Sequence, residues 1–184
     1  MKRVYLIRHG LPDFPQGQRM CLGRTDLPLG VTGLEQARAM AASLPPVSAV
    51  FSSPLQRALQ TAQAIGNPII VEGLQELSAG DWDGLLFSEI QQRYPALYAA
   101  RGITPGLPLP NGESDESGLL RFCQAMEQAA GMASGDFAVV SHGGVIRLFL
   151  RHLGGHPRKP AYTEVVPLLY ENGNFILQEE MPHA

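Results

Sequence analysis

The fold is decided by two stretches that share one plan, Val4-Tyr5-Leu6-Ile7-Arg8-His9-Gly10 and Phe137-Ala138-Val139-Val140-Ser141-His142-Gly143-Gly144. Each is a short apolar run that ends in His-Gly. Short apolar runs bounded by turn residues are typical of buried strands, and glycine lets the backbone turn sharply and approach a ligand closely. The carboxyl ends of parallel strands meet at one edge of a sheet, where ligands bind. We therefore expect His9 and His142 to meet at that edge.

Between and around these two runs, apolar segments alternate with segments of helical period. Further strands are predicted at residues 49–52 and 68–72, and Asn172-Gly173 between residues 165–170 and 175–178 is a hairpin signal. The alternation predicts an α/β fold, a three-layer sandwich. Its mostly parallel central sheet would carry helices on both faces and an antiparallel hairpin at one edge.

Helix starts are predicted from three capping signals. Thr32-Gly33-Leu34-Glu35 reads as a capping box, Ser53-Pro54 as a cap followed by proline at the first helical position, and Ser114 as the cap of a helix to about Met132. The apolar face of the first of these helices is predicted to comprise Leu34, Ala37, Ala41 and Leu44. A further helix is expected over residues 87–94, with Pro95 interrupting or restarting it, and residues 102–112 are expected to form a surface loop.

Length and composition favour one soluble domain over residues 1–184. The chain is 45% hydrophobic and 17% charged, which excludes disorder for most of it, and its net charge of −3 comes without a basic run, which argues against a nucleic-acid partner. No apolar run approaches the length of a membrane span. The N-terminus has two basic residues and then only four apolar ones, too few for a signal peptide, so a cytoplasmic location is expected. Cys21 and Cys123 are expected to be free thiols, and neither a metal nor a cofactor is expected.

Basic residues near the two histidines predict an anion site. Arg8 precedes His9, and Arg57 would lie one turn into the helix that Ser53 caps, near the positive end of the helix dipole. An anion would offset that repulsion, whereas the alternative interpretation is a solvated surface arginine. The turn His142-Gly143-Gly144 would offer backbone N–H groups to the same anion, and helix N-termini and arginine forks both favour phosphate.

A proton donor is expected from the glycine-rich loop after the third strand. Three carboxyl groups compete for that role, those of Glu76, Asp81 and Asp83. The structural interpretation of the same loop is a turn-rich connection whose Trp82 fills the core. The residue types alone leave this choice open.

Five segments in order resemble the histidine phosphatase superfamily, in its phosphoglycerate mutase-like branch, over nearly the whole chain. They are Arg8-His9-Gly10, the Gly23–Ala37 region, Ser52-Ser53-Pro54 with Arg57, Glu76-Leu77 with Gly80, Trp82 and Gly84, and Gly112-Glu113-Ser114 with Val140–Gly144. The resemblance implies that His9 is a nucleophile forming a phosphohistidine. It implies that Arg8, Arg57 and His142, with Gly143, bind phosphoryl oxygens, and that Glu76 protonates the leaving oxygen and then helps to activate water. No metal is required by such a mechanism, because cations facing the equatorial oxygens can supply the charge stabilisation.

Departures from the family pattern favour hydrolysis over phosphoryl transfer. Mutase members usually carry Asn a few residues beyond Arg-His-Gly and Arg after the loop Glu, whereas this chain has no such Asn and has Leu77. The chain looks most like the small phosphomonoesterases of the α-ribazole phosphatase and broad-specificity type. The alternatives are mutase-type phosphoryl transfer and a catalytically silent phosphoester-binding protein.

The natural substrate is not readable from the sequence beyond a small phosphorylated molecule. Specificity is expected from the loop at residues 11–24 and the insert at residues 94–110, which can cover the site. Arg19, Arg24 and Arg101 are candidates for holding a second anionic group, with solvated surface charge as the alternative for each. The hairpin edge could pair with a second copy in a homodimer or face solvent.

Overall fold

The computed structural model describes residues 1–104, 106–156 and 158–178. Its strands are β1 (Lys2–Arg8), β2 (Ala49–Ser52), β3 (Ile69–Ile70), β4 (Phe137–Ser141), β5 (Val165–Glu171) and β6 (Asn174–Leu177). Its helices are α1 (Val31–Ser43), α2 (Gln56–Gln63), α3 (Phe87–Arg93), α4 (Pro95–Ile103), α5 (Asp115–Met132) and α6 (Gly143–His152). Short 3₁₀ turns are η1 (Pro15–Gly17), η2 (Glu72–Leu74) and η3 (Gly80–Trp82). Pro105, part of the predicted surface loop, lies outside the described residues.

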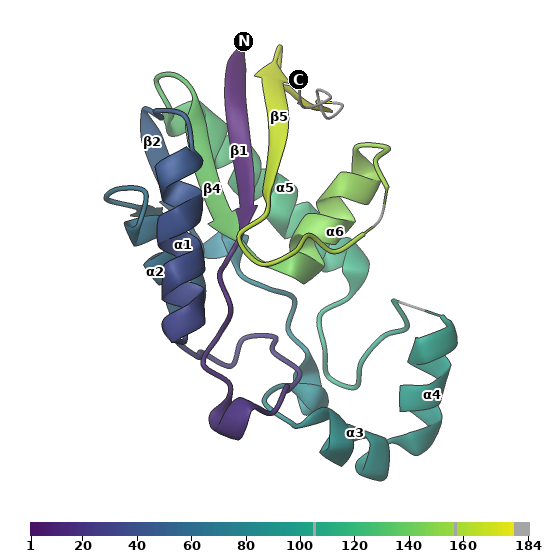
Figure 1. The fold of residues 1–184 in the computed structure, drawn as a ribbon. Helices are drawn as coiled ribbons and strands as arrows, with labels where there is room; N and C mark the ends of the chain where they lie inside the picture. Colours follow the sequence, from purple (N-terminus) through teal and green to yellow (C-terminus); the bar gives the residue numbers. More distant parts are fainter. Residues whose placement is uncertain (105, 157, 179–184) are drawn as a thin grey trace.

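The strands form one six-stranded sheet in the order β3-β2-β4-β1-β5-β6 (Figure 1). Strands β3, β2, β4 and β1 are mutually parallel, β5 runs antiparallel to β1, and β6 runs antiparallel to β5. The predicted α/β fold with an antiparallel hairpin at one edge is confirmed. Strands β1 and β4 are direct neighbours, with Arg8 opposite Ser141. The residue that follows each of these two strands is a histidine, so the register of β1 against β4 brings His9 and His142 together.

Each face of the sheet is covered by its own helices. Figure 1 shows α1 and α2 on one side of the sheet and α5 and α6 on the other. Alternate residues of β1 divide between the two cores, because successive side chains of a strand point to opposite faces. Val4 and Leu6 join the core beneath α5 and α6, whereas Tyr5 and Ile7 join the core beneath α1 and α2. The sheet is therefore buried on both faces, as a mostly parallel sheet requires.

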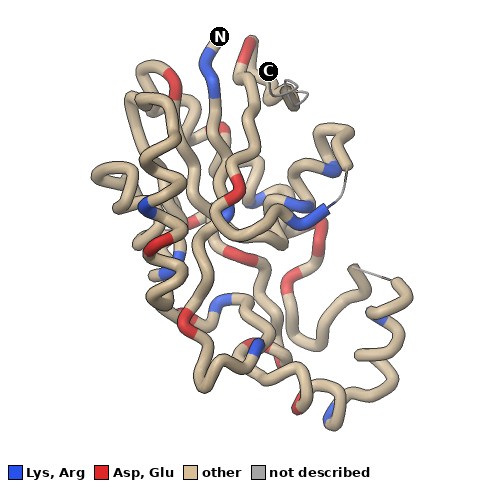
Figure 2. The backbone as a smooth tube through the Cα atoms, in the orientation of Figure 1, with Lys and Arg blue, Asp and Glu red and all other residues tan. Residues whose placement is uncertain are grey.

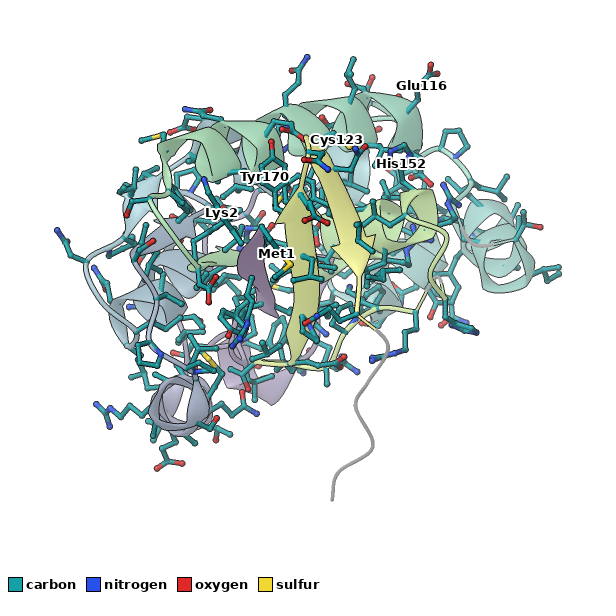
Figure 3. All side chains as sticks on the ribbon, turned by 90° about the horizontal axis from the view of Figure 1, so that it is seen from above. Met1, Lys2, Glu116, Cys123, His152 and Tyr170 are labelled. Carbon is teal, nitrogen blue, oxygen red and sulfur yellow. The ribbon has the colours of Figure 1, made fainter. Side chains whose placement is uncertain are left out.

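Two links fasten α5 to the neighbouring strands β1 and β5. Seen from above, Lys2 and Tyr170 lie between the strands and α5 (Figure 3). The Nζ of Lys2 donates to the carbonyls of Ala130 and Ala133 at 2.7 Å each, and the Tyr170 hydroxyl donates to Glu127 at 2.7 Å. A lysine at the last carbonyls of a helix complements the negative end of the helix dipole.

Helix α1 begins earlier than the sequence predicts. Gly30, not Thr32, is its N-cap residue, and no side chain caps it. The Gly30 N–H donates to the carbonyl of Leu11 at 3.1 Å, which keeps the chain extended as far as Gly30 and lets the helix start at Val31. The buried face is consequently Gly33, Ala37 and Met40. Of the predicted face only Ala37 is fully buried, and Leu34, Ala41 and Leu44 are half-buried.

Helix α2 begins later than predicted, because Ser53 is not its cap. Its N-cap residue is Leu55, and the backbone N–H of Gln56 donates to the carboxylate of Asp26 at 2.7 Å. A residue thirty positions away thus does the capping, which no local pattern could reveal. Arg57 is then the second helical residue rather than one turn in. The predicted strand over residues 68–72 is also shorter, since only Ile69 and Ile70 pair with β2 and η2 begins at Glu72.

Helices α3 and α4 lie beyond the carboxyl ends of the parallel strands (Figure 1). Pro95 restarts the helix as α4, which confirms the predicted break. A small separate core of Ala79, Trp82 and Ile90 holds this segment, with Tyr94 and Tyr98 packed against it. Trp82 therefore fills a core, as the structural interpretation of its loop predicted.

Two further predictions are confirmed at the level of single residues. Ser114 caps α5, accepting the Ser117 N–H at 3.1 Å. Asn172 and Gly173 have φ of 52° and 77°, the left-handed values that a two-residue type I′ hairpin turn needs. None of the helices in the described ranges combines the length and the apolar character needed to cross a bilayer.

The cap at Ser114 gives a test of the fold. Ser114→Ala removes the acceptor of an orphan helix N–H and should lower the free energy of unfolding by about 1 kcal/mol. Ser117→Ala is the matched control, because the Ser117 side chain is exposed and its backbone N–H is unchanged. Urea denaturation measures both variants, and equal losses in the two would show that the cap contributes nothing.

Candidate active site

Two buried histidines form the centre of the site. The ring centroids of His9 and His142 lie 5.1 Å apart. His9 Nδ1 lies 2.7 Å from the carbonyl of Gly10, so the proton resides on Nδ1 and Nε2 carries a lone pair. His142 Nε2 lies 2.7 Å from Ser53 Oγ, and the Ser53 oxygen also accepts the Leu55 N–H at 3.3 Å. When the serine hydroxyl donates to Nε2, the proton of His142 lies on Nδ1.

Two arginines lie beside the histidines, and the fold holds each with backbone carbonyls. Arg8 Nη1 donates to the carbonyl of Pro160 at 2.7 Å, and its guanidinium carbon stands 3.8 Å from the ring centroid of Tyr162. Arg57 is 1% exposed, and its Nη1 and Nη2 donate to the carbonyls of Thr25 and Gly23 at 2.8 Å each. Arginine keeps its charge at these positions. Both cations are therefore fixed in place before any ligand arrives.

Burial and positive charge keep both imidazoles neutral. Burial lowers the pKa of His9 well below the ordinary 6.5, and the positive charges of Arg57, Arg8 and Lys159 lower it further. The pKa of His142 is also well below 6.5, because of burial first and then Arg57. A neutral imidazole with a free Nε2 is the form of histidine that can act as a nucleophile.

Three polar atoms of this cluster have no hydrogen-bond partner. They are Arg8 Nε, Arg57 Nε and His142 Nδ1, three of the four such buried side-chain atoms in the described part of the chain. A buried polar atom without a partner costs about 1–3 kcal/mol. Their concentration at one place, all on groups that can donate, indicates that an anionic ligand completes the site.

Glu76 reaches the site from the loop that follows η2. Its Oε2 accepts the Gly144 N–H at 2.8 Å, and its Oε1 accepts the Val145 N–H at 3.0 Å and the Leu77 N–H at 2.9 Å. The N-terminus of α6 favours a negative charge there. These bonds correct one prediction, because the Gly144 N–H goes to Glu76 and not to an anion from solution.

The other two candidate carboxylates have different partners. Asp83 accepts the backbone N–H groups of Gly23, Arg24 and Thr25 at 2.9, 2.7 and 3.2 Å. It thereby fixes the loop whose carbonyls hold Arg57, a positioning contact that the sequence did not reveal. Asp81 accepts from the Asn111 side chain at 2.9 Å. Of the three, only Glu76 lines the cavity beside His9.

Arg8, His9 and Glu76 line a small cavity, whereas Arg57 and His142 are fully buried beside His9 and do not line it. The small cavity measures about 90 Å³ and is lined by Arg8, His9, Arg19, Glu76, Lys159, Tyr162 and neighbouring residues. A second cavity of about 460 Å³ shares Leu22, Glu76 and Lys159 with it. Figure 2 shows basic and acidic residues from different segments of the chain near the place where the parallel strands end. No group of three metal-ligating side chains occurs within the described ranges.

Lys159 and Tyr162 are the site residues that the sequence analysis missed. They precede β5, which runs antiparallel to β1 and therefore begins at the edge where β1 ends. The hairpin prediction already placed an antiparallel strand here, so its preceding residues could have been assigned to the functional edge. The sequence predicts Ser53 as a helix cap, whereas in the structure it is the hydrogen-bond partner of His142.

Comparisons with known proteins agree with this geometry. The model of the histidine phosphatase superfamily (branch 1) matches residues 4–179. The uncharacterized phosphatase PhoE of Bacillus subtilis is 30% identical over 184 residues, covering 95% of this chain and 89% of that protein. A solved structure of a mycobacterial glucosyl-3-phosphoglycerate phosphatase in complex with VO3 has a TM-score of 0.82 and 25% identity, covering 97% of this chain and 98% of that one.

A longer relative occurs in Mycobacterium tuberculosis. Its bifunctional protein is 34% identical over 158 residues, which cover 81% of this chain but 43% of that protein. The chain thus spans less than half the length of this relative.

The neutral histidines make stability depend on pH in a defined direction. Their folded-state pKa lies below the unfolded value of about 6.5, so below that pH the unfolded chain binds protons that the folded chain excludes. The free energy of unfolding should keep its full value above about pH 7. It should decrease as the pH falls below about 6.5, by up to about 1.4 kcal/mol per pH unit for each histidine. Urea unfolding between pH 5 and about pH 8 measures this slope.

The His9→Asn variant should reduce that slope by about one proton. His152→Asn, at an exposed position of α6, should leave it unchanged. An unchanged slope in His9→Asn would contradict a neutral buried His9.

Proposed function

This chain belongs to branch 1 of the histidine phosphatase superfamily, and on that premise we propose that it is a phosphomonoesterase acting on a small phosphorylated metabolite. The reaction proceeds through a phosphohistidine on His9. The observation that carries the proposal is the set of three partnerless buried atoms on Arg8, Arg57 and His142 around a neutral nucleophile. We further propose that the protein acts in the cytoplasm and that residues 1–184 form a single domain.

In the first step His9 Nε2 attacks phosphorus. The P–Nε2 bond forms while the bond from phosphorus to the leaving oxygen breaks, and Glu76 gives that oxygen a proton. The negative charge of the bound phosphoryl group favours the protonated carboxyl form needed for this donation. Arg8, Arg57 and the Nδ1–H of His142 face the non-bridging oxygens, where they stabilise the charge of the transition state. The Gly143 turn lies beside the same group.

In the second step water attacks the phosphohistidine. The P–Nε2 bond breaks, the Glu76 carboxylate takes the proton of the water, and phosphate leaves while His9 returns to its neutral form. Charge stabilisation in both steps comes from groups that the fold already holds in place. Fixed groups of this kind need little reorganisation during the reaction.

Replacing the nucleophile tests the proposal directly. His9→Ala should lower kcat for para-nitrophenyl phosphate by at least about a thousandfold, because it removes the nitrogen that forms the covalent intermediate. His152→Ala, a histidine exposed on α6, should keep wild-type turnover. Acid-labile, base-stable phosphate should appear on the wild type during turnover and not on His9→Ala. Unchanged turnover in His9→Ala would reject the assignment.

The proton donor is tested by the nature of the leaving group. Glu76→Gln should lower kcat/KM for an alkyl phosphate by roughly 10²–10⁴-fold, because an alkoxide must be protonated as it leaves. For para-nitrophenyl phosphate kcat/KM should fall much less, since nitrophenolate leaves unaided and kcat/KM does not report the later attack of water. Asp81→Asn makes the same chemical change at a carboxylate outside the cavity and should affect neither ester. Equal losses of kcat/KM on both esters would show that Glu76 is not the proton donor.

A further inference from the structure

The cavity next to the phosphoryl site has a composition that points to one substrate class. It measures about 460 Å³, and Glu76 stands in the wall that it shares with the small cavity. If Glu76 protonates the leaving oxygen, as proposed above, the leaving group extends from that wall into the larger cavity. What lines the larger cavity therefore decides which leaving groups fit.

Two carboxylates of this cavity are already engaged by arginines. Glu113 pairs with Arg121 at 2.8 Å and with Arg24 at 3.4 Å, so that its charge is balanced and Arg24 is occupied. Asp115 is shared between Arg147 at 3.9 Å and Arg151 at 3.6 Å, both longer than a hydrogen bond. One carboxylate thus faces two guanidinium groups.

Two further cations line the same cavity, and no ion pair involves either of them in the described part of the chain. Arg101 of α4 lies with its guanidinium carbon 5.6 Å from the ring centroid of Trp82. Lys159 lines both cavities, and its methylene chain lies against Gly143. Three acidic and three basic side chains line the larger cavity, so its wall is balanced in charge overall. Glu113 and Asp115 are already paired with arginines, which leaves Arg101 and Lys159 as cations without a carboxylate partner among the described residues.

Arg101 and Arg147 act on each other across this space. Burial lowers the pKa of Arg101, Cys21 and Asp115 oppose that shift, and the positive charge of Arg147 adds to it. Two cations from different elements, α4 and α6, thus face one cavity. The attraction of Asp115 on Arg101 outweighs the repulsion by Arg147, but Asp115 lies too far from Arg147 for a hydrogen bond. A ligand anion between the two guanidinium groups would accept charge-assisted hydrogen bonds from both.

The cavity also has an apolar lining. It includes Leu77, Leu107, Pro108 and Leu109. The leaving group that fits has a hydrocarbon or ring portion against these residues and a charged end toward the arginines. A small neutral alcohol would leave both features unused.

We infer that this enzyme prefers phosphomonoesters whose leaving group carries a second anionic group, a carboxylate or a second phosphate, held by Arg101 and Arg147. The inference rests on the proposed function for the orientation of the substrate. It selects Arg101 among the three arginines that the sequence offered for this purpose. Arg19 lines the phosphoryl cavity instead, and Arg24 pairs with Glu113.

Non-hydrolysable ligands test the subsite without turnover. Benzylphosphonate, para-carboxybenzylphosphonate and para-xylylenebisphosphonate share one phosphonate head and differ only in the far end. Calorimetry on the wild-type protein should give one of the two doubly anionic ligands an affinity higher than that of benzylphosphonate by about tenfold or more. Which of the two gains more tells whether the second group is a carboxylate or a phosphate.

Variants then locate the effect. Arg101→Met with Arg147→Met should abolish the advantage of the doubly anionic ligands while changing the affinity for benzylphosphonate less than about threefold. The single Arg101→Met variant, which leaves α6 intact, should remove part of it. Arg93→Met on α3, an arginine whose ion pair is with Glu89, is the matched control and should keep the full advantage.

The outcomes separate this inference from the proposed function. Equal affinities for the three phosphonates, no binding of any of them, or an advantage that survives in the double variant would each overturn the subsite. Hydrolysis of para-nitrophenyl phosphate by the same preparation is the test of the proposed function. A binding advantage without hydrolysis would keep the subsite and reject the phosphatase, and hydrolysis without the advantage would do the reverse.

Discussion

The site depends on two guanidinium groups, one buried and one half-buried, beside two uncharged imidazoles. Burying charge is costly unless it is paired or hydrogen-bonded, and Arg8 and Arg57 have carbonyls as partners rather than carboxylates. Carbonyls hold the groups in place without neutralising them. The positive charge therefore stays available, the histidines stay neutral, and the remaining cost is relieved only when an anion occupies the cavity.

Each functional group of the site is held by a different part of the fold. The register of β1 against β4 places His9 beside His142. Asp83 orders the loop that carries the acceptors of Arg57, and the N-terminus of α6 orders Glu76. No single local motif could build this arrangement, since the contributors come from every third of the chain. The result is a site whose geometry exists before ligand binds, which is the condition for electrostatic catalysis.

How much could be predicted from the sequence follows from the range of the interactions. The hairpin at Asn172-Gly173 and the cap at Ser114 depend on adjacent residues, and both were predicted correctly. The starts of α1 and α2 depend on Leu11 and Asp26, distant partners that a local pattern does not contain, and both predictions were wrong. His9 and His142 could be brought together because parallel strands share an edge. Lys159 and Tyr162 were missed because their placement requires a further step. The antiparallel direction of β5 must first be predicted, and only then do the residues before it fall at the edge where β1 ends.

The Gly143-Gly144 pair shows why the two cavities cannot vary independently. A side chain at Gly143 would collide with the methylene groups of Lys159, and a Cβ at Gly144 would stand 2.5 Å from Glu76 Oε1. Both neighbours line both cavities. Enlarging either glycine would displace a residue that faces the phosphoryl group and the leaving group at once. The two glycines therefore leave the space that Glu76 and Lys159 occupy between the two cavities. A change at either glycine would alter both cavities together.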